Sequence, residues 1–122
     1  MTQTERAAIV AALRRAFGTA RDVSLNQDQP LVVLLGRLRL PTPWTSPGQA
    51  LVRFADWPSS RPEFFIDPDV KNEKGEPPRS NSEVAVLGRT WRQFSFSFPW
   101  DGSELDPVKA VELWLTRFRL AE

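Results

Sequence analysis

The stretch Phe54-Ala-Asp-Trp-Pro-Ser-Ser-Arg-Pro-Glu-Phe-Phe65 decides how this chain is expected to fold. Apolar and polar residues alternate over 50–56, and aromatic residues resume at 63–67, so each flank is typical of a β-strand. The prolines at positions 58 and 62 fix the backbone of the short connection between the flanks. We therefore expect two neighbouring antiparallel strands joined by a rigid corner, with aromatic rings filling the core beneath.

Upstream of this corner, the sequence predicts a helix and one more strand. Thr2 and Glu5 are spaced as a capping box, and an apolar stripe recurs every four residues up to Phe17, so a helix is expected over 3–17. Gly18 suits the position after the last turn of this helix. Residues 31–40 have the pattern of a strand, and the proline-rich stretch at 41–48 indicates a turn.

Downstream of the corner, residues 68–83 are polar, lack an apolar period and are expected to form a long loop. Strand character returns at 84–87 and at 90–98, where phenylalanines alternate with serines. Asp106 and Pro107 suit the N-cap and the first position of a C-terminal helix. The sequence thus predicts one α+β domain spanning 1–122, with an N-terminal helix, an antiparallel meander sheet of about four strands and a C-terminal helix.

The composition excludes several classes of function. The chain has no cysteine and no histidine, which removes thiol nucleophiles, imidazole bases and most zinc or iron sites. A formal net charge of +1 gives no basic footprint for nucleic acid or anionic lipid. The longest apolar run is too short for a membrane span, and the polar N-terminus does not resemble a signal peptide. We expect a cytoplasmic protein without a cofactor.

Two further features of the sequence could bind a ligand, but a simpler structural role is expected for each. Asp67 and Asp69 would share a face of an extended segment and could hold a hard cation, but metal sites usually recruit more oxygen ligands, so no metal site is predicted. Five tryptophans could stack on single-stranded nucleic acid, but no basic groove accompanies them. Trp44, in the proline-rich turn, is expected to be an exposed anchor for a partner. The tryptophans expected in the core are Trp57, Trp91 and Trp114.

The corner and its surroundings resemble ubiquitin-conjugating enzymes. Between the third and fourth strands of that family, an aromatic-proline pair precedes a second proline and an aromatic strand, as in 54–65. The stretch Asp67-Pro-Asp-Val70 is similar in outline to the family's His-Pro-Asn-apolar segment, and Trp100 precedes a capped helix as a tryptophan does there. The stretch Gly88-Arg-Thr-Trp-Arg-Gln-Phe94 is similar to divergent bacterial members. The resemblance implies a UBC/RWD-like fold and a place in a prokaryotic ubiquitin-like conjugation or antiphage-defence system.

The chain departs from this family at the positions of its chemistry. The family's nucleophilic cysteine would fall near 75–78, and none is present. Asp67 replaces the histidine, and Asp69 replaces the asparagine whose amide supports the oxyanion, where a carboxylate would repel developing negative charge. Thioester chemistry is therefore impossible for this sequence, whether the cysteine is naturally absent or has been substituted.

One functional hypothesis is that the protein is a non-catalytic interaction module. It would bind a ubiquitin-like protein, an activating enzyme or another component. The resemblance implies that basic residues of the N-terminal helix contact the activating enzyme, and Arg14 and Arg15 are the candidates. The alternative is that both are solvated charges that stabilise the helix C-terminus.

A second hypothesis is that a serine carries the modifier as an oxyester. Ser80 and Ser82 follow the family's nucleophile position, and Ser95 and Ser97 lie farther along. A serine hydroxyl needs a base, which without histidine would be Asp69, another acid, a lysine or a group of a partner. Ordinary loop serines are the simpler interpretation. A third possibility is a small protein-binding module unrelated to ubiquitin-like conjugation.

Overall fold

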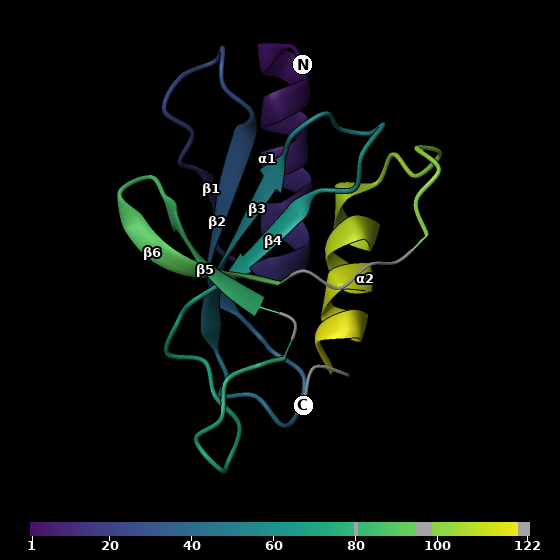
Figure 1. The fold of residues 1–122 in the computed structure, drawn as a ribbon. Helices are drawn as coiled ribbons and strands as arrows, with labels where there is room; N and C mark the ends of the chain where they lie inside the picture. Colours follow the sequence, from purple (N-terminus) through teal and green to yellow (C-terminus); the bar gives the residue numbers. More distant parts are fainter. Residues whose placement is uncertain (80, 95–98, 120–122) are drawn as a thin grey trace.

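The computed structural model describes residues 1–79, 81–94 and 99–119 (Figure 1). Two helices and six strands follow one another in this part of the chain. In order they are α1 (Gln3–Phe17), β1 (Ala20–Asp22), β2 (Leu31–Leu38), β3 (Gly48–Phe54), β4 (Glu63–Ile66), β5 (Asn81–Val86), β6 (Arg89–Phe94) and α2 (Pro107–Arg119). The predicted α+β class is therefore confirmed, with one helix near each end of the described chain.

The predicted sheet, a meander of about four strands, is wrong. The described strands form one six-stranded sheet in the order β1-β2-β3-β4-β6-β5, and all neighbours are antiparallel. β1 carries no sequence signal because its 3 residues are too few to show a period. The two later strands form a hairpin, and its second strand, β6, pairs with β4. β5 therefore lies at the edge of the sheet, although it comes directly after β4 in the sequence.

The helix ends predicted from the sequence are confirmed. The amide of Glu5 donates to Thr2 Oγ1 over 3.1 Å and the amide of Thr2 donates to Glu5 Oε1 over 3.3 Å, which completes the capping box. Gly18 ends α1 at a φ of 86°, where a side chain would be strained. The Asp106 carboxylate accepts an amide of the first turn of α2 over 2.9 Å.

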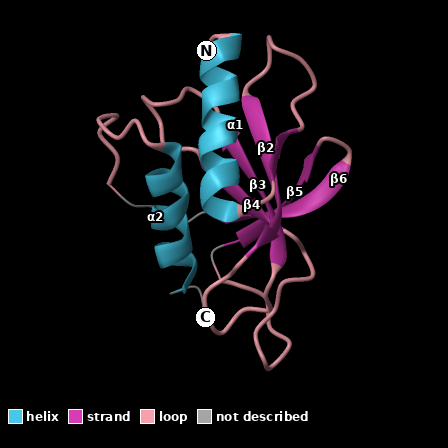
Figure 2. Ribbon diagram, turned by 180° about the vertical axis from the view of Figure 1, so that it is seen from behind, coloured by secondary structure: helices cyan, strands magenta, loops and turns pink. Residues whose placement is uncertain are grey.

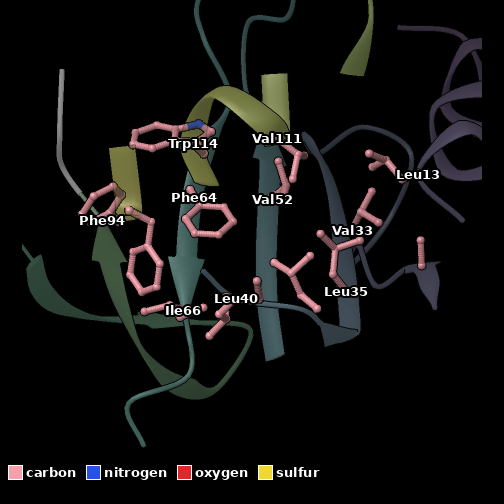
Figure 3. Packing of buried hydrophobic residues seen from close by; sticks show 14 of the residues in the cluster. Leu13, Val33, Leu35, Leu40, Val52, Phe64, Ile66, Phe94, Val111 and Trp114 are labelled. Carbon is pink, nitrogen blue, oxygen red and sulfur yellow. The ribbon is translucent and has the colours of Figure 1, made fainter. Parts of the chain in front are cut away.

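Both helices lie side by side on one face of the sheet (Figure 2). The main core fills the space between them and this face (Figure 3). It is rich in aromatic rings: Trp114 stacks on Phe64 with centroids 5.9 Å apart, and Phe118 meets Phe94 edge-on at 5.2 Å. The helix residues buried in this core are Ile9, Val10, Leu13, Val111, Trp114 and Phe118.

The opposite face of the sheet carries a second, smaller core. Neither α1 nor α2 covers this face; instead residues near the tip of the β5–β6 hairpin pack against the central strands. Arg53 lies over the ring of Phe65 at 5.0 Å and Arg89 over that of Trp91 at 4.3 Å, so arginine side chains help to shield the aromatic rings. The buried members of this second core are Val32, Leu51, Phe65, Val86 and Trp91.

The hairpin turns at Leu87 and Gly88, which both have positive φ, at 54° and 79°. Two central residues of positive φ make a type I′ turn, whose twist matches that of the flanking strands. A leucine in this region is strained by its Cβ, and this one is 41% exposed. The sequence predicts the break between the two strands, but a Leu-Gly pair does not identify the turn type.

The polar segment expected to be a loop over 68–83 is shorter than predicted, because β5 begins at Asn81. Over 68–79 the chain has local order: the side-chain oxygen of Asn72 accepts two amides of the following turn, over 2.9 and 3.0 Å. Val70 anchors this segment in the main core. The strand predicted over 90–98 is described as far as Phe94, and its remaining positions lie outside the described residues.

Candidate functional site

The corner between β3 and β4 is built from tryptophans and prolines. The Trp57–Pro58 peptide bond is cis. The indole nitrogen of Trp100 donates to Pro58 O over 2.8 Å, and that of Trp114 donates to Pro62 O over 2.8 Å. The carbonyls of both prolines therefore tie this corner to α2 and to the segment that precedes it. The two prolines predicted to fix the connection also act as its attachment points.

A hollow of about 470 Å³ lies beside the corner, within the size range of ligand sites. Most polar side chains of this hollow whose contacts are described form hydrogen bonds within the protein. Glu63 is held by Arg53 through two hydrogen bonds of 2.8 and 2.7 Å and by Gln93 over 3.2 Å. The hydrogen bonds to Glu63 raise the pKa of Arg53 and fix this ion pair. The hollow is lined by Ser59, Ser60, Arg61, Pro62, Glu63, Gln93, Phe94, Trp100 and Trp114.

The segment after β4 is a turn organised by Asp67. Its Oδ1 accepts the amide of Asp69 over 2.8 Å, and its Oδ2 pairs with Arg89 Nη2 over 2.8 Å. Arg89 also donates to Gln49 Oε1 over 2.9 Å, which joins the turn, β3 and the hairpin at one point. Because the segment turns, Asp67 and Asp69 do not alternate along an extended strand. Within the described residues no group of three or more acidic side chains gathers that could hold a metal ion.

The position that the resemblance assigns to the nucleophile is a compact turn. Gly75 has a φ of 78°, and its amide donates to Asn72 O over 3.0 Å. Pro78 is buried, whereas Asp69 is exposed. The four residues over 75–78 are glycine, glutamate and two prolines, so this stretch supplies neither a thiol nor a hydroxyl in place of the absent cysteine.

The candidate serines are not brought into a catalytic arrangement by the residues described. Ser80, Ser95 and Ser97 lie outside the described part of the chain. Ser82 is exposed on β5, opposite Gln93 of β6. Its hydroxyl makes no hydrogen bond with any described residue, so neither Asp69 nor another described acid is positioned as its base.

The two candidate arginines of α1 differ in their contacts. Both are exposed near the end of the helix. Arg14 Nε donates to Ala20 O over 3.1 Å and so holds the helix end against β1. Arg15 makes no ion pair or hydrogen bond with the described residues, which leaves its whole guanidinium available to a partner. The structure therefore separates a partly structural Arg14 from a free Arg15.

The prediction that Trp44 is an exposed anchor is wrong. Its side chain is 4% exposed, its indole nitrogen donates to Phe118 O over 2.9 Å, and the two rings lie 5.2 Å apart. Burying so large an apolar surface beneath the end of α2 is favourable, and the carbonyl of Phe118 satisfies the indole donor. Trp91 and Trp114 are buried as predicted, and Trp57 is partly buried against the main core.

Sequence reasoning did not identify Arg6, the only buried charged side chain among the described residues, at 3% exposure. Its Nη1 donates to Gln27 O over 2.8 Å and to Gln29 O over 2.9 Å, and Nη2 reaches Asn26 O over 3.4 Å. Its Nε is buried without a partner. The available signal was its position three residues before Ile9, on the buried side of the helix.

Comparison of the chain with protein-family models, with curated proteins and with solved structures finds no match in any of the three. Of the described elements, neither α1 nor α2 is long and apolar enough to cross a membrane. A functional proposal for this chain therefore depends on its residues and their geometry.

Proposed function

We propose that this chain is a cysteine-less relative of ubiquitin-conjugating enzymes that acts as a partner-binding component of a bacterial ubiquitin-like conjugation system. We place it in the cytoplasm and in the setting of antiphage defence. Its partners would be a ubiquitin-like protein and an activating enzyme. The proposal extends the sequence resemblance, and the order of α1, the antiparallel strands β2, β3 and β4, and the Trp57–Pro58 corner supports it.

The observation that carries the proposal is what stands at each position where the family has a catalytic group. Asp67, in the place of the histidine, is occupied by a turn amide and by Arg89. Asp69, in the place of the oxyanion-supporting asparagine, is an exposed carboxylate. The nucleophile position lies in a turn without a thiol or hydroxyl. These positions therefore lack the thiol, imidazole and amide groups on which the family's transfer chemistry depends.

The exposed end of α1 supports the choice of an activating enzyme as a partner. Arg15 is exposed on α1 and has no ion pair or hydrogen bond among the described residues, and a guanidinium forms forked hydrogen bonds with carboxylates. Arg14 contributes charge at the same place while one of its nitrogens holds Ala20. We expect Arg15 to contribute more of the binding free energy than Arg14.

The first experiment asks whether the protein carries the modifier. The protein is mixed with its cognate activating enzyme, the ubiquitin-like protein and ATP, and any adduct is tested for resistance to thiol reductant and for cleavage by alkali. Measurable binding without an adduct supports the proposal. An alkali-labile adduct that disappears in Ser80→Ala or Ser82→Ala would replace it with the oxyester hypothesis. Absence of binding to both components would favour an unrelated protein-binding module.

The second experiment locates the contact on α1. Arg15→Glu is compared with Arg39→Glu, which makes the same charge change at another exposed arginine that lies outside α1. We expect Arg15→Glu to weaken binding to the activating enzyme about tenfold and Arg39→Glu to leave it within a factor of two, on the scale of single interface charges. Equal effects of both variants would show a general charge effect and contradict a contact at this helix.

A further inference from the structure

β5 is an edge strand of the described sheet and has no outer neighbour among the described strands. The direction of its free backbone groups follows from the hairpin turn. A two-residue turn closes on a hydrogen-bonded pair, here Val86 with Arg89. Bonded and non-bonded pairs alternate along an antiparallel ladder, so Glu83 and Ala85 direct their N–H and C=O groups away from β6. Both residues are exposed. Their backbone amides donate no hydrogen bond, and their carbonyls accept none, elsewhere in the described chain.

The two edges of the sheet differ in how they are protected. β1, at one edge, has only 3 residues, and the carbonyl of Ala20 is already taken by Arg14. β5, at the other edge, has 6 residues in unbroken register with β6 and contains neither proline, lysine nor a bulge. Natural proteins use these devices, or very short strands, to block unwanted pairing at sheet edges. The one such device on β5 is the charged side chain of Glu83, which opposes pairing with a second acidic strand but not pairing with a basic one.

The side chains of β5 define what can bind there. Successive side chains alternate between the two faces, so Val84 faces the second core, where it is half-buried, and Glu83 faces the other side. The Glu83 carboxylate is exposed and has no ion pair or hydrogen bond within the described residues. Arg92 of β6 lies opposite Glu83 but donates to Val70 O and forms no ion pair with it among the described contacts. An added strand would therefore meet an apolar side chain on one face and an acidic side chain on the other.

We propose that the outer edge of β5 receives an extended segment of a partner protein in which apolar and basic residues alternate. The backbone of the segment pairs with Glu83 and Ala85, a β-branched side chain packs against Val84, and a basic side chain lies opposite Glu83. The inference rests on this edge alone and holds whether or not the partner belongs to a conjugation system.

Charge favours this occupant over a second copy of the chain. Pairing of β5 with itself would bring two Glu83 carboxylates to neighbouring strands without a basic residue between them, which is unfavourable. A single pair of six-residue strands also buries less area than stable dimers need. A basic segment from another protein removes the repulsion and neutralises the charge.

The test uses a blocked peptide of sequence Thr-Val-Lys-Val-Lys-Val-Thr and the full chain. We expect titration to shift the backbone NMR signals of β5 and to slow amide hydrogen exchange at Glu83 and Ala85. The same peptide with N-methyl groups on alternate amides, and a version with glutamate in place of lysine, should each bind at least about tenfold more weakly. Absence of exchange protection at these two amides under saturating peptide would overturn the proposal.

Two variants distinguish edge pairing from general attraction. Ala85→Pro removes an outward N–H that the fold does not use, so the fold should persist while peptide binding falls about tenfold or more. Glu83→Lys should reverse the preference between the lysine and glutamate peptides, whereas the matched charge change Glu112→Lys on α2 should not. Undiminished binding by a folded Ala85→Pro protein would refute the pairing. A dimer that Ala85→Pro converts to a monomer would assign the edge to a second copy.

Discussion

Replacement of Arg6 tests whether a buried guanidinium holds the loop between β1 and β2. The three acceptors, the carbonyls of residues 26, 27 and 29, all belong to this loop, and the donor belongs to α1. Arg6→Met keeps most of the side-chain volume and removes every hydrogen bond. The variant therefore separates the loss of the polar contacts from the creation of a cavity.

The expected loss of stability follows from the geometry. Two of the bonds, at 2.8 and 2.9 Å, are short, and the third, at 3.4 Å, is weak. A hydrogen bond to a charged donor contributes about 1.5–3 kcal/mol, so the two short bonds together are worth about 3–6 kcal/mol. The variant no longer buries a charge without an ion-pair partner, and water can hydrate the loop carbonyls. These two gains offset roughly half of the lost hydrogen-bond free energy. We expect Arg6→Met to lower the free energy of unfolding by about 2–3 kcal/mol.

Urea denaturation followed by tryptophan fluorescence measures this change, because several indoles lie in the cores. At roughly 4 °C per kcal/mol, the melting temperature should fall by about 10 °C. Arg15→Ala, an exposed arginine of the same helix, should change the free energy of unfolding by less than about 0.5 kcal/mol. If Arg6→Met unfolds at the wild-type urea concentration, the burial cost cancels the hydrogen bonds and the reasoning fails.

Three further predictions concern the turn, a tight glycine and one carboxyl group. Leu87→Asn should raise the free energy of unfolding by about 1 kcal/mol in a denaturant titration, because asparagine tolerates positive φ better than leucine; a loss of stability would contradict the strain. Gly48→Ala should lower the free energy of unfolding by about 1–3 kcal/mol in a denaturant titration, because a Cβ would lie 2.8 Å from Leu40 Cδ1. An unchanged free energy of unfolding would show that the leucine side chain moves aside. Hydrogen bonds from Ser103 lower the pKa of Asp101, so its stabilising contribution is present above the unfolded pKa and disappears as pH falls through the folded one. Ser103→Ala should raise this pKa in an NMR titration of the carboxyl carbon, and an unmoved titration would refute the assignment.

The parts of the fold predicted from sequence are those whose chemistry is local. The capping box at Thr2, the glycine after α1 and the Asp106-Pro107 pair mark helix ends through contacts within a few residues. The Trp57–Pro58 corner is equally local, because proline fixes its own backbone. These features were predictable without knowing which strands pair.

The parts that were not predicted depend on distant partners. β1 exists because it pairs with β2, and its own three residues do not specify a strand. The position of β6 beside β4 depends on the second core, to which Trp91 of β6 and Phe65 of β4 both belong. Trp44 is buried because α2 returns over the proline-rich turn at Phe118. Composition around a residue does not reveal such long-range neighbours.

The same limit applies to the candidate site. The absence of cysteine and histidine, which excludes thiol and imidazole groups from any site, could be established from the sequence alone. The commitment of Asp67 to Arg89 was not visible, because the two residues are separated by the whole 68–88 segment. The difference between Arg14 and Arg15 was likewise invisible, since it depends on the carbonyl of Ala20.

The strand order has a consequence for how the chain assembles. β6 meets β5 through a tight turn, but it meets β4 only after the chain has closed over the intervening segment. Nearby strands find each other sooner, because closing a short loop loses less chain entropy. We expect the late hairpin to form as a preassembled piece that docks onto the earlier strands, so that Trp91 reaches its place only in the last stage of folding.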